Sequence, residues 1–162
     1  MKQKIKKREP LRRIVKTLKT KGKKIVFTNG CFDLLHIGHI RYLEKAKTLG
    51  DFLIVGINSD ASVRKLKGIK RPILPQNERA EILSGLECIN YITVFDEPDP
   101  LKLITSLQPD ILAKGGDWTK DRIVGKDVVE KSGGKVVTIP FVRGASTTNL
   151  IETILKRYEK RV

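Results

Sequence analysis

One stretch decides the fold: Ile25-Val26-Phe27-Thr28-Asn29-Gly30-Cys31-Phe32-Asp33-Leu34-Leu35-His36-Ile37-Gly38-His39. It combines an apolar β-strand, a turn of small and polar residues, and the first turn of an amphipathic helix. The start of a helix has free backbone N–H groups and the positive end of the helix dipole, so it attracts phosphate. Because His36 and His39 are three residues apart, they share one helix face, and Gly38 leaves room for a base or phosphate. The stretch therefore predicts a phosphate site at a strand–helix junction.

The same two histidines have alternative interpretations. A pair three residues apart is also typical of half a zinc site, and a single histidine at a helix start is often a capping or surface residue. The chain has two histidines and two cysteines, and Cys31 and Cys88 have no zinc-binding spacing to the histidines. Phosphate binding is therefore favoured, and no metal ligand is assigned. Cys31 is expected to be a small filler of the turn, since no further histidine could serve as its base.

The net charge of +15 lies mostly at one end of the chain. Residues 1–24 contain twelve Lys or Arg side chains and one acid, Glu9, whereas the rest contains 21 basic and 17 acidic side chains. Apolar residues at helical spacing after Pro10 predict a short amphipathic helix with a solvated basic face. We expect a basic leader over residues 1–22 and one main domain over residues 23–162. No aromatic residues alternate with these charges, so neither nucleic acid nor a membrane is the expected partner.

Composition narrows the class further. The length suits one domain with a real core. No apolar run approaches the length of a membrane span, and no secretory signal is recognised, so we expect a cytoplasmic protein. Two cysteines do not make a disulfide framework.

Apolar, β-branched runs alternate with helical patterns along the chain. This predicts an α/β fold, a Rossmann-like doubly wound parallel sheet of about five strands with helices on both faces. Such sheets bind ligands beyond the carboxyl ends of their strands. The predicted strands are Lys24–Thr28, Phe52–Ile57, Tyr91–Phe95, Asp110–Ala113 and Lys135–Ile139. The predicted helices are Gly38–Leu49, Gln76–Cys88, Pro100–Leu107, Asp121–Lys131 and Thr147–Tyr158.

Polar and cationic residues follow the second predicted strand. Asn58 and Asp60 can cap a helix or bind a ribose or sugar hydroxyl. Lys65, Lys67 and Arg71 form a cationic group that could meet phosphates, although a solvated loop is the simpler interpretation. Further on, an arginine in the first turn of a helix opposes the helix dipole, so Arg79 is a candidate anion ligand.

Two later segments also follow strands. Lys114-Gly115-Gly116-Asp117-Trp118 offers a charge, an acceptor and a stacking face, although a tight turn would explain the glycines. Ser146-Thr147-Thr148 opens the last helix and can be an ordinary cap or a second phosphate cradle. If it faces the first cradle, two helix starts would hold a triphosphate. There is no Walker-type P-loop and no nucleophile–base set, so direct in-line transfer at phosphorus fits best.

These motifs together resemble a known family. Gly30-Cys31-Phe32-Asp33-x-x-His36-x-Gly38-His39 and the late Ser146-Thr147-Thr148 are similar to the cytidylyltransferase-like nucleotidyltransferase superfamily. With Lys114-Gly115-Gly116-Asp117-Trp118, the chain resembles the adenylyltransferase domain of ADP-heptose synthesis. The resemblance implies a reaction in which ATP and D-glycero-β-D-manno-heptose 1-phosphate give ADP-heptose and pyrophosphate with Mg²⁺. The product would feed the lipopolysaccharide inner core or another surface glycan.

The resemblance also implies roles for individual residues. It implies a nucleotidyltransferase domain over residues 23–162, with catalytic roles for His36, His39, Lys65 and Lys67. Nucleotide contacts are implied for Thr28, Asn29, Gly30, Cys31, Phe32, Asp33, Gly38, Ser146, Thr147 and Thr148. Substrate contacts are implied for Asn58, Asp60, Arg71, Arg79, Lys114, Gly115, Gly116, Asp117 and Trp118. Mg²⁺ would rest mainly on the ATP phosphates.

Several alternatives stay open. The first motif does not distinguish ATP from CTP, so a cytidylyltransferase for glycerol 3-phosphate or a phospho-alcohol, or an FAD-synthetase-like adenylyltransferase, remains possible. The basic leader leaves a non-catalytic nucleotide- or RNA-binding module as a different class. His36-Ile37-Gly38-His39 is also the ATP motif of class I aminoacyl-tRNA synthetases, but their lysine-rich second signature is missing. In many bacteria the domain is fused to a sugar kinase; here we expect a separate kinase, and a homodimer or larger assembly.

Overall fold

Strands and helices alternate along the chain, as the sequence predicts. The computed structural model describes residues 2–116, 123–142 and 144–158. The strands are β1 (Ile25–Gly30), β2 (Phe52–Asn58), β3 (Tyr91–Phe95), β4 (Ile111–Gly115) and β5 (Lys135–Ile139). The helices are the 3₁₀ turn η1 (Lys2–Lys4), α1 (Arg8–Thr20), α2 (Ile37–Lys47), α3 (Asp60–Lys67), α4 (Gln76–Ser84), α5 (Leu101–Leu107), α6 (Lys126–Lys131) and α7 (Thr147–Tyr158).

The strands form one parallel sheet in the order β3-β2-β1-β4-β5. β1 lies in the middle, paired with β2 on one side and β4 on the other. Its apolar residues Ile25–Phe27 are fully buried, which explains why the strand is continuously apolar. The chain runs outward in one direction from β1 to β3 and returns to build β4 and β5 on the other side. The predicted doubly wound fold is therefore confirmed, with its topological switch point between β1 and β4.

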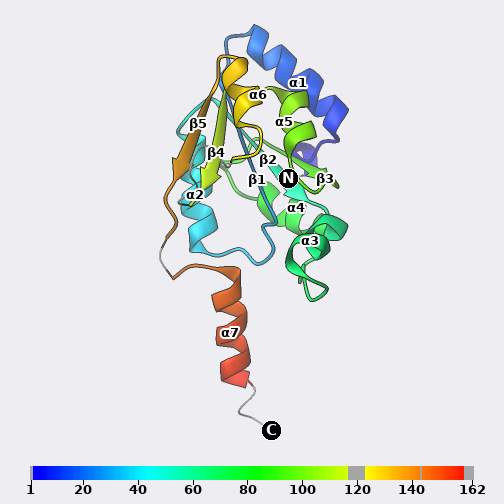
Figure 1. The fold of residues 1–162 in the computed structure, drawn as a ribbon, viewed down its shortest axis with the longest axis vertical. Helices are drawn as coiled ribbons and strands as arrows, with labels where there is room; N and C mark the ends of the chain where they lie inside the picture. The colour runs from blue at the N-terminus through cyan, green and yellow to red at the C-terminus, as the bar shows by residue number, and fades with distance from the viewer. Residues whose placement is uncertain (1, 117–122, 143, 159–162) are drawn as a thin grey trace.

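Helices cover both faces of the sheet (Figure 1). One apolar cluster joins Val26 and Leu53 to Leu43 of α2 and Leu83 of α4. The opposite cluster joins alternate strand residues to α1, α5 and α6, and includes Leu11, Val15, Ile25, Phe27, Leu103, Ile104, Leu112 and Val129. Successive strand residues point to opposite faces, so each strand contributes to both clusters.

The basic N-terminal segment contributes to the core. Leu11 and Val15 of α1 are buried, whereas Arg12, Arg13 and Lys16 are exposed. This is the amphipathic helix that the apolar spacing predicts. None of the helices within the described ranges is long and apolar enough to cross a membrane.

Some element boundaries differ from the prediction. Residues 60–67, where the lysines favoured a loop, form α3, because Ser59 caps the helix by accepting from the Ser62 N–H at 3.2 Å. α4 ends at Ser84, since Gly85 is its C-cap. β4 continues through Gly115, so Lys114 lies on the strand rather than after it. The helix predicted from Asp121 begins at Lys126, and residues 121 and 122 lie outside the described ranges.

The last helix extends away from the rest of the molecule (Figure 1). α7 buries none of its residues, and Leu150, Ile154 and Leu155 are exposed along it. Its first residues lie near the start of α2, which brings the two motifs at residues 30–39 and 146–148 together.

Candidate active site

The candidate site lies at the carboxyl ends of β1 and β4, at the switch point of the sheet. Asn29 and Gly30 end β1, and Lys114 and Gly115 end β4. This is where open parallel sheets bind ligands, because two neighbouring loops leave the sheet in opposite directions. The residues singled out from the sequence therefore lie at the edge of the sheet where open parallel sheets bind ligands.

The loop between β1 and α2 presents free backbone donors. Phe32 is buried and has the positive φ of 44°, which a non-glycine residue adopts only where its surroundings impose it. Within the described ranges, no protein acceptor is recorded for the N–H groups of Phe32, Ile37 or Gly38. Orphan donors at a helix start are the groups that bind phosphate.

The two histidines form a stacked pair. Their ring centroids are 3.8 Å apart with an interplanar angle of 24°, and the Phe32 ring lies 5.2 Å from that of His39. Nδ1 of each histidine is buried and lacks a hydrogen-bond partner among the described residues. Burial lowers the pKa of His36, and burial together with the charge of His36 lowers the pKa of His39 to about 4. Both rings are thus neutral near pH 7, and a bound polyanion would favour their protonation.

The second motif meets this loop at Gly38. A Cβ at Gly38 would lie 2.9 Å from Nδ1 of His36 and 3.1 Å from Cβ of Ala145, so only glycine lets the segments approach this closely. Thr147 Oγ1 donates to the Leu34 carbonyl at 3.2 Å, and Ser146 caps α7 by accepting from the Asn149 N–H. Thr148 is exposed. The structure therefore brings both predicted cradles together.

Asp33 does not face the site with a free carboxylate. It accepts from Nε of Arg71 at 2.5 Å and from the backbone N–H groups of Ile73 and Leu74 at 2.9–3.0 Å. Burial opposes its charge, but these donors outweigh burial and hold the pKa of Asp33 below its usual value. We call residues 71–74 the strap. The strap is thereby fastened to the β1–α2 loop; the partners of Asp33 in the strap were not predicted from the sequence.

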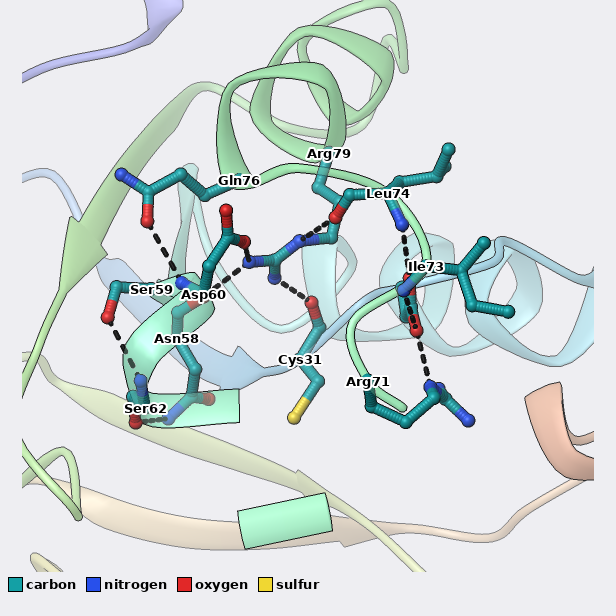
Figure 2. A network of polar contacts seen from close by, with 11 residues as sticks. Cys31, Asn58, Ser59, Asp60, Ser62, Arg71, Ile73, Leu74, Gln76 and Arg79 are labelled. Atoms are coloured by element: carbon teal, nitrogen blue, oxygen red, sulfur yellow. Dashed lines mark hydrogen bonds and ion pairs between the residues drawn. The ribbon is translucent and has the colours of Figure 1, made fainter. Parts of the chain in front are cut away.

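Arg79 is a buried hub rather than a free cation (Figure 2). Its guanidinium donates to the carbonyls of Cys31, Asn58 and Leu74 and to the carboxylate of Asp60. It is 1% exposed, so four of its five N–H donors are committed to protein acceptors. The sequence-based interpretation of Arg79 as a direct anion ligand therefore gives way to a structural role in joining four segments. Asp60 is engaged in the same network.

Asn58 is likewise directed into the protein. It is buried, and its Nδ2 donates to Ser62 Oγ at 3.0 Å, which in turn donates to the Glu97 carbonyl. Gln76 accepts from the Asp60 N–H at 2.9 Å, so the start of α3 is tied to α4 (Figure 2).

Lys114 brings a largely buried cation to the switch point. Its Nζ donates to Asn29 Oδ1 at 2.6 Å, and burial lowers its pKa to about 8. No carboxylate is paired with it in the described part of the chain. A buried ammonium with only an amide partner is suited to an anionic ligand. Beside it, Thr28 is hydrogen-bonded to the Tyr42 hydroxyl at 2.6 Å, and burial raises the pKa of Tyr42 to about 12.

The remaining predicted residues divide into three groups. Lys65 and Lys67 are exposed in the last turn of α3. Burial raises the pKa of Cys31, while the charges of Lys67, Arg79 and Arg71 oppose this, so Lys67 acts electrostatically on the β1–α2 loop. Gly115 and Gly116 approach the ring of Phe141, where a Cβ would lie 3.0 and 2.3 Å away. Asp117 and Trp118 lie outside the described residues.

Three features were missed at the sequence level: the binding of Asp33 by the backbone of Ile73 and Leu74, the side chain of Tyr42, and the side chain of Phe141. Each acts through a partner far away in sequence, such as Asp33 with Leu74. One indication for Phe141 was present in the sequence: it is an aromatic residue shortly after β5, at the edge of the sheet where the candidate site lies.

The chain is similar in sequence to a known family and to curated proteins. A family model described as cytidylyltransferase-like matches residues 27–154. The chain is 58% identical over 157 residues to bifunctional protein HldE of Syntrophotalea carbinolica and 59% identical over 151 residues to that of Geotalea uraniireducens. These alignments cover 97% and 93% of the chain but 32% and 31% of the relatives, so the chain spans about a third of their length.

Two solved structures share the fold. A lipopolysaccharide core biosynthesis protein from Thermoplasma volcanium aligns with a TM-score of 0.63 and 29% identity, over 76% of this chain and all of that one. Pantoate–beta-alanine ligase from Francisella tularensis aligns with a TM-score of 0.65 over 96% of this chain and 77% of that one. At 20% identity, the second likeness concerns the fold alone.

Proposed function

The chain belongs to the cytidylyltransferase-like family, and on that premise we propose that it transfers AMP from ATP to a sugar 1-phosphate. The products are a nucleoside diphosphate sugar and pyrophosphate. The sugar we propose is D-glycero-β-D-manno-heptose, because the motifs resemble the adenylyltransferase domain of ADP-heptose synthesis. The similarity to bifunctional proteins HldE and to a lipopolysaccharide core biosynthesis protein supports this choice.

One observation carries the proposal. Two stacked imidazoles lie at the start of α2, beside the segment that opens α7, and their buried Nδ1 atoms have no hydrogen-bond partner among the described residues. Buried polar atoms without partners are rare in folded proteins, and at a functional site they are groups that a ligand satisfies. The free N–H groups around them favour phosphate as that ligand.

The chemistry is a single displacement at phosphorus. A phosphate oxygen of the sugar 1-phosphate attacks the α-phosphorus of ATP, the bond from that phosphorus to the bridging oxygen breaks, and pyrophosphate leaves. His36 and His39 would stabilise the charge that develops at the α-phosphorus. Lys114 would hold the attacking phosphate, and Lys65 and Lys67 would approach the leaving pyrophosphate. Positioning and charge neutralisation supply most of the rate enhancement.

The chain's own groups suit a metal carried by the nucleotide. Within the described ranges, no three His, Cys, Asp or Glu side chains gather as a metal site. The Asp33 carboxylate is occupied by Arg71 and by two backbone N–H groups. Mg²⁺ bound to the ATP phosphates would neutralise charge on the leaving group.

The wider setting is also a proposal. We place the reaction in the cytoplasm, where a sugar kinase activity would supply the sugar 1-phosphate. Self-association into a homodimer or larger assembly is supported by the apolar side chains of Leu150, Ile154 and Leu155 exposed on α7.

A panel of acceptors tests the proposal. Pyrophosphate release is measured with ATP or CTP and with heptose 1-phosphate, other sugar 1-phosphates, glycerol 3-phosphate, phosphocholine and FMN. We expect turnover with ATP and a sugar 1-phosphate, fastest with the heptose. Turnover confined to CTP, or to FMN, would refute the assignment and favour one of the alternative transferases.

The control variant is Glu81→Gln, at an exposed position of α4. It should match the parent protein with every acceptor. A protein that binds ATP but turns over none of the acceptors would contradict an enzymatic role.

A further inference from the structure

Asp33 is the most completely occupied acidic group near the site. Its side chain is fully buried, yet it carries a charge that burial alone would disfavour. Oδ1 accepts from the N–H groups of Ile73 and Leu74, and Oδ2 accepts from the Ile73 N–H and from Nε of Arg71. These four contacts come from three N–H donors, because both oxygens share the Ile73 N–H. The carboxylate is directed at the strap, and its side chain has no exposed surface to offer a metal ion or a ribose hydroxyl.

The strap is held from two sides. Asp33 binds the N–H of Leu74, and Arg79 donates to the carbonyl of the same residue at 3.0 Å. Arg79 also donates to the Cys31 carbonyl, two residues before Asp33 (Figure 2). The strap and the β1–α2 loop are therefore joined into one buried polar network. Breaking one member of such a network leaves the others unsatisfied.

The network also determines which way the Phe32 N–H of the β1–α2 loop points. In a trans peptide the C=O and the following N–H point in opposite directions. Because the Cys31 carbonyl turns toward Arg79, the Phe32 N–H points away from Arg79, and no protein acceptor within the described ranges takes it. Arg71 donates to Asp33 through Nε, and within the described ranges its terminal nitrogens have no protein acceptor and could meet an anion.

We propose that Asp33 is a positioning residue that fastens the strap to the β1–α2 loop and thereby holds Arg71 and the neighbouring cations over the phosphate site. It acts through Arg71 and the strap, and it does not ligate the metal. This inference rests on the proposed nucleotidyl transfer, since it assigns how that site keeps its shape.

A double-mutant cycle tests the coupling. Asp33→Asn keeps the size and removes the charge, and Arg71→Gln removes the partner. Each single change should lower kcat/KM for ATP about 10- to 100-fold, the range for a buried charge-assisted hydrogen bond. If Asp33 acts through Arg71, the double variant is about as slow as the slower single variant. Multiplied losses in the double variant would overturn the proposal.

Metal dependence separates positioning from ligation. The Mg²⁺ concentration giving half-maximal turnover should be the same for Asp33→Asn and for the parent protein. Binding of ATP in EDTA should weaken by the same factor as binding of MgATP. A shifted Mg²⁺ requirement, or rescue by Mn²⁺, would assign Asp33 to the metal instead.

A third readout does not depend on catalysis. Limited trypsin digestion cleaves after Lys65, Lys67 and Lys70, which precede the strap and are exposed. Asp33→Asn should accelerate cleavage at these sites, while Glu81→Gln, a matched acid-to-amide change on α4, should leave it unchanged. Unchanged cleavage in Asp33→Asn would overturn the proposal. If the parent protein turns over no sugar phosphate, the proposed function fails, and digestion and ATP binding still decide whether Asp33 holds the strap.

Discussion

The two walls of the candidate site are built differently. On one side of the histidine pair, Asp33 and Arg79 hold the strap through buried, charge-assisted hydrogen bonds. On the other side, the start of α7 is linked to the β1–α2 loop, in the recorded contacts of the described residues, by the hydrogen bond from Thr147 to the Leu34 carbonyl. The close contact of Ala145 with Gly38 adds to it.

This difference has an energetic meaning. A neutral hydrogen bond contributes about 0.5–1.5 kcal/mol, whereas removing one member of a buried charged network costs several times more. The strap wall is therefore set before the nucleotide binds. The α7 wall can shift at a low cost in free energy. This suits a segment that must let ATP enter and pyrophosphate leave.

The largest expected effect comes from the residues between the two walls. His36→Ala or His39→Ala should lower kcat by about 10²–10⁴, the range for removing one group that stabilises transition-state charge. The melting temperature should change little, because neither Nδ1 makes a hydrogen bond within the described structure. Steady-state kinetics and thermal unfolding measure the two effects. Near-normal turnover in both variants would contradict the roles of the histidines.

A smaller effect should follow when the two walls are pushed apart. In Gly38→Ala, the new Cβ meets the His36 ring and Ala145, so we expect about a tenfold loss of kcat/KM, typical of a displaced catalytic group. Ala is preferred to Gly within a helix by about 0.5–1 kcal/mol, but the contact of the new Cβ with the His36 ring and Ala145 opposes this gain. Activity would thus fall while the stability of the fold changes little.

The rescue variant is Ala145→Gly, which removes the opposing Cβ. Gly38→Ala with Ala145→Gly should recover part of the lost activity if the two segments meet as the structure has them. Equal activity in the single and double variants would argue against contact between the walls.

The arrangement of the two histidines follows from the local sequence, whereas the contacts that hold the strap do not. His36, Gly38 and His39 lie within one helix start, where local spacing determines which groups face the same way. Asp33 meets the strap across about forty residues, and no local pattern indicates such a contact. Arg79 was interpreted from its place in a helix turn, but its four acceptors come from segments that only the folded sheet brings together.

The sheet itself was predictable because its signal is repetitive. β3 and β5 match the predicted ranges, since both are short runs rich in β-branched residues, which favour strands. α3 was missed because its lysines favoured a loop, although Ser59 is a good N-cap. Lys114 was predicted as a charge at this edge and lies at the end of β4, but its contact with Asn29 depends on β1 and β4 being neighbours.

Removing the link to α7 should give a smaller change. Thr147→Val keeps the shape and removes the donor to Leu34, so KM for ATP should rise about 3- to 10-fold, the equivalent of one neutral hydrogen bond. Thr148→Val, at an exposed neighbouring position, is the matched comparison. Hydrogen exchange at the start of α7 should increase in Thr147→Val. Unchanged exchange and KM would mean that other contacts hold this wall.

The smallest effect is a pH dependence of stability that originates at His39. Its pKa is about 4 in the folded protein and about 6.5 in the unfolded chain, so the unfolded state binds more protons between these values. The stability that neutral His39 preserves is therefore complete above pH 6.5 and is lost as the pH falls toward 4. Since His39 is only partly buried, its contribution should stay below the one-proton limit of about 1.4 kcal/mol per pH unit.

Urea unfolding of the parent protein and of His39→Gln at pH 7, 5.5 and 4.5 measures this contribution. The free energy of unfolding should fall more steeply with decreasing pH in the parent, and added ATP should flatten its slope, because phosphates favour the protonated ring. Equal slopes would mean that His39 is as well solvated as in the unfolded chain. The ring would then be open to water, and the α7 wall would stand further from α2 than the contact at Gly38 requires.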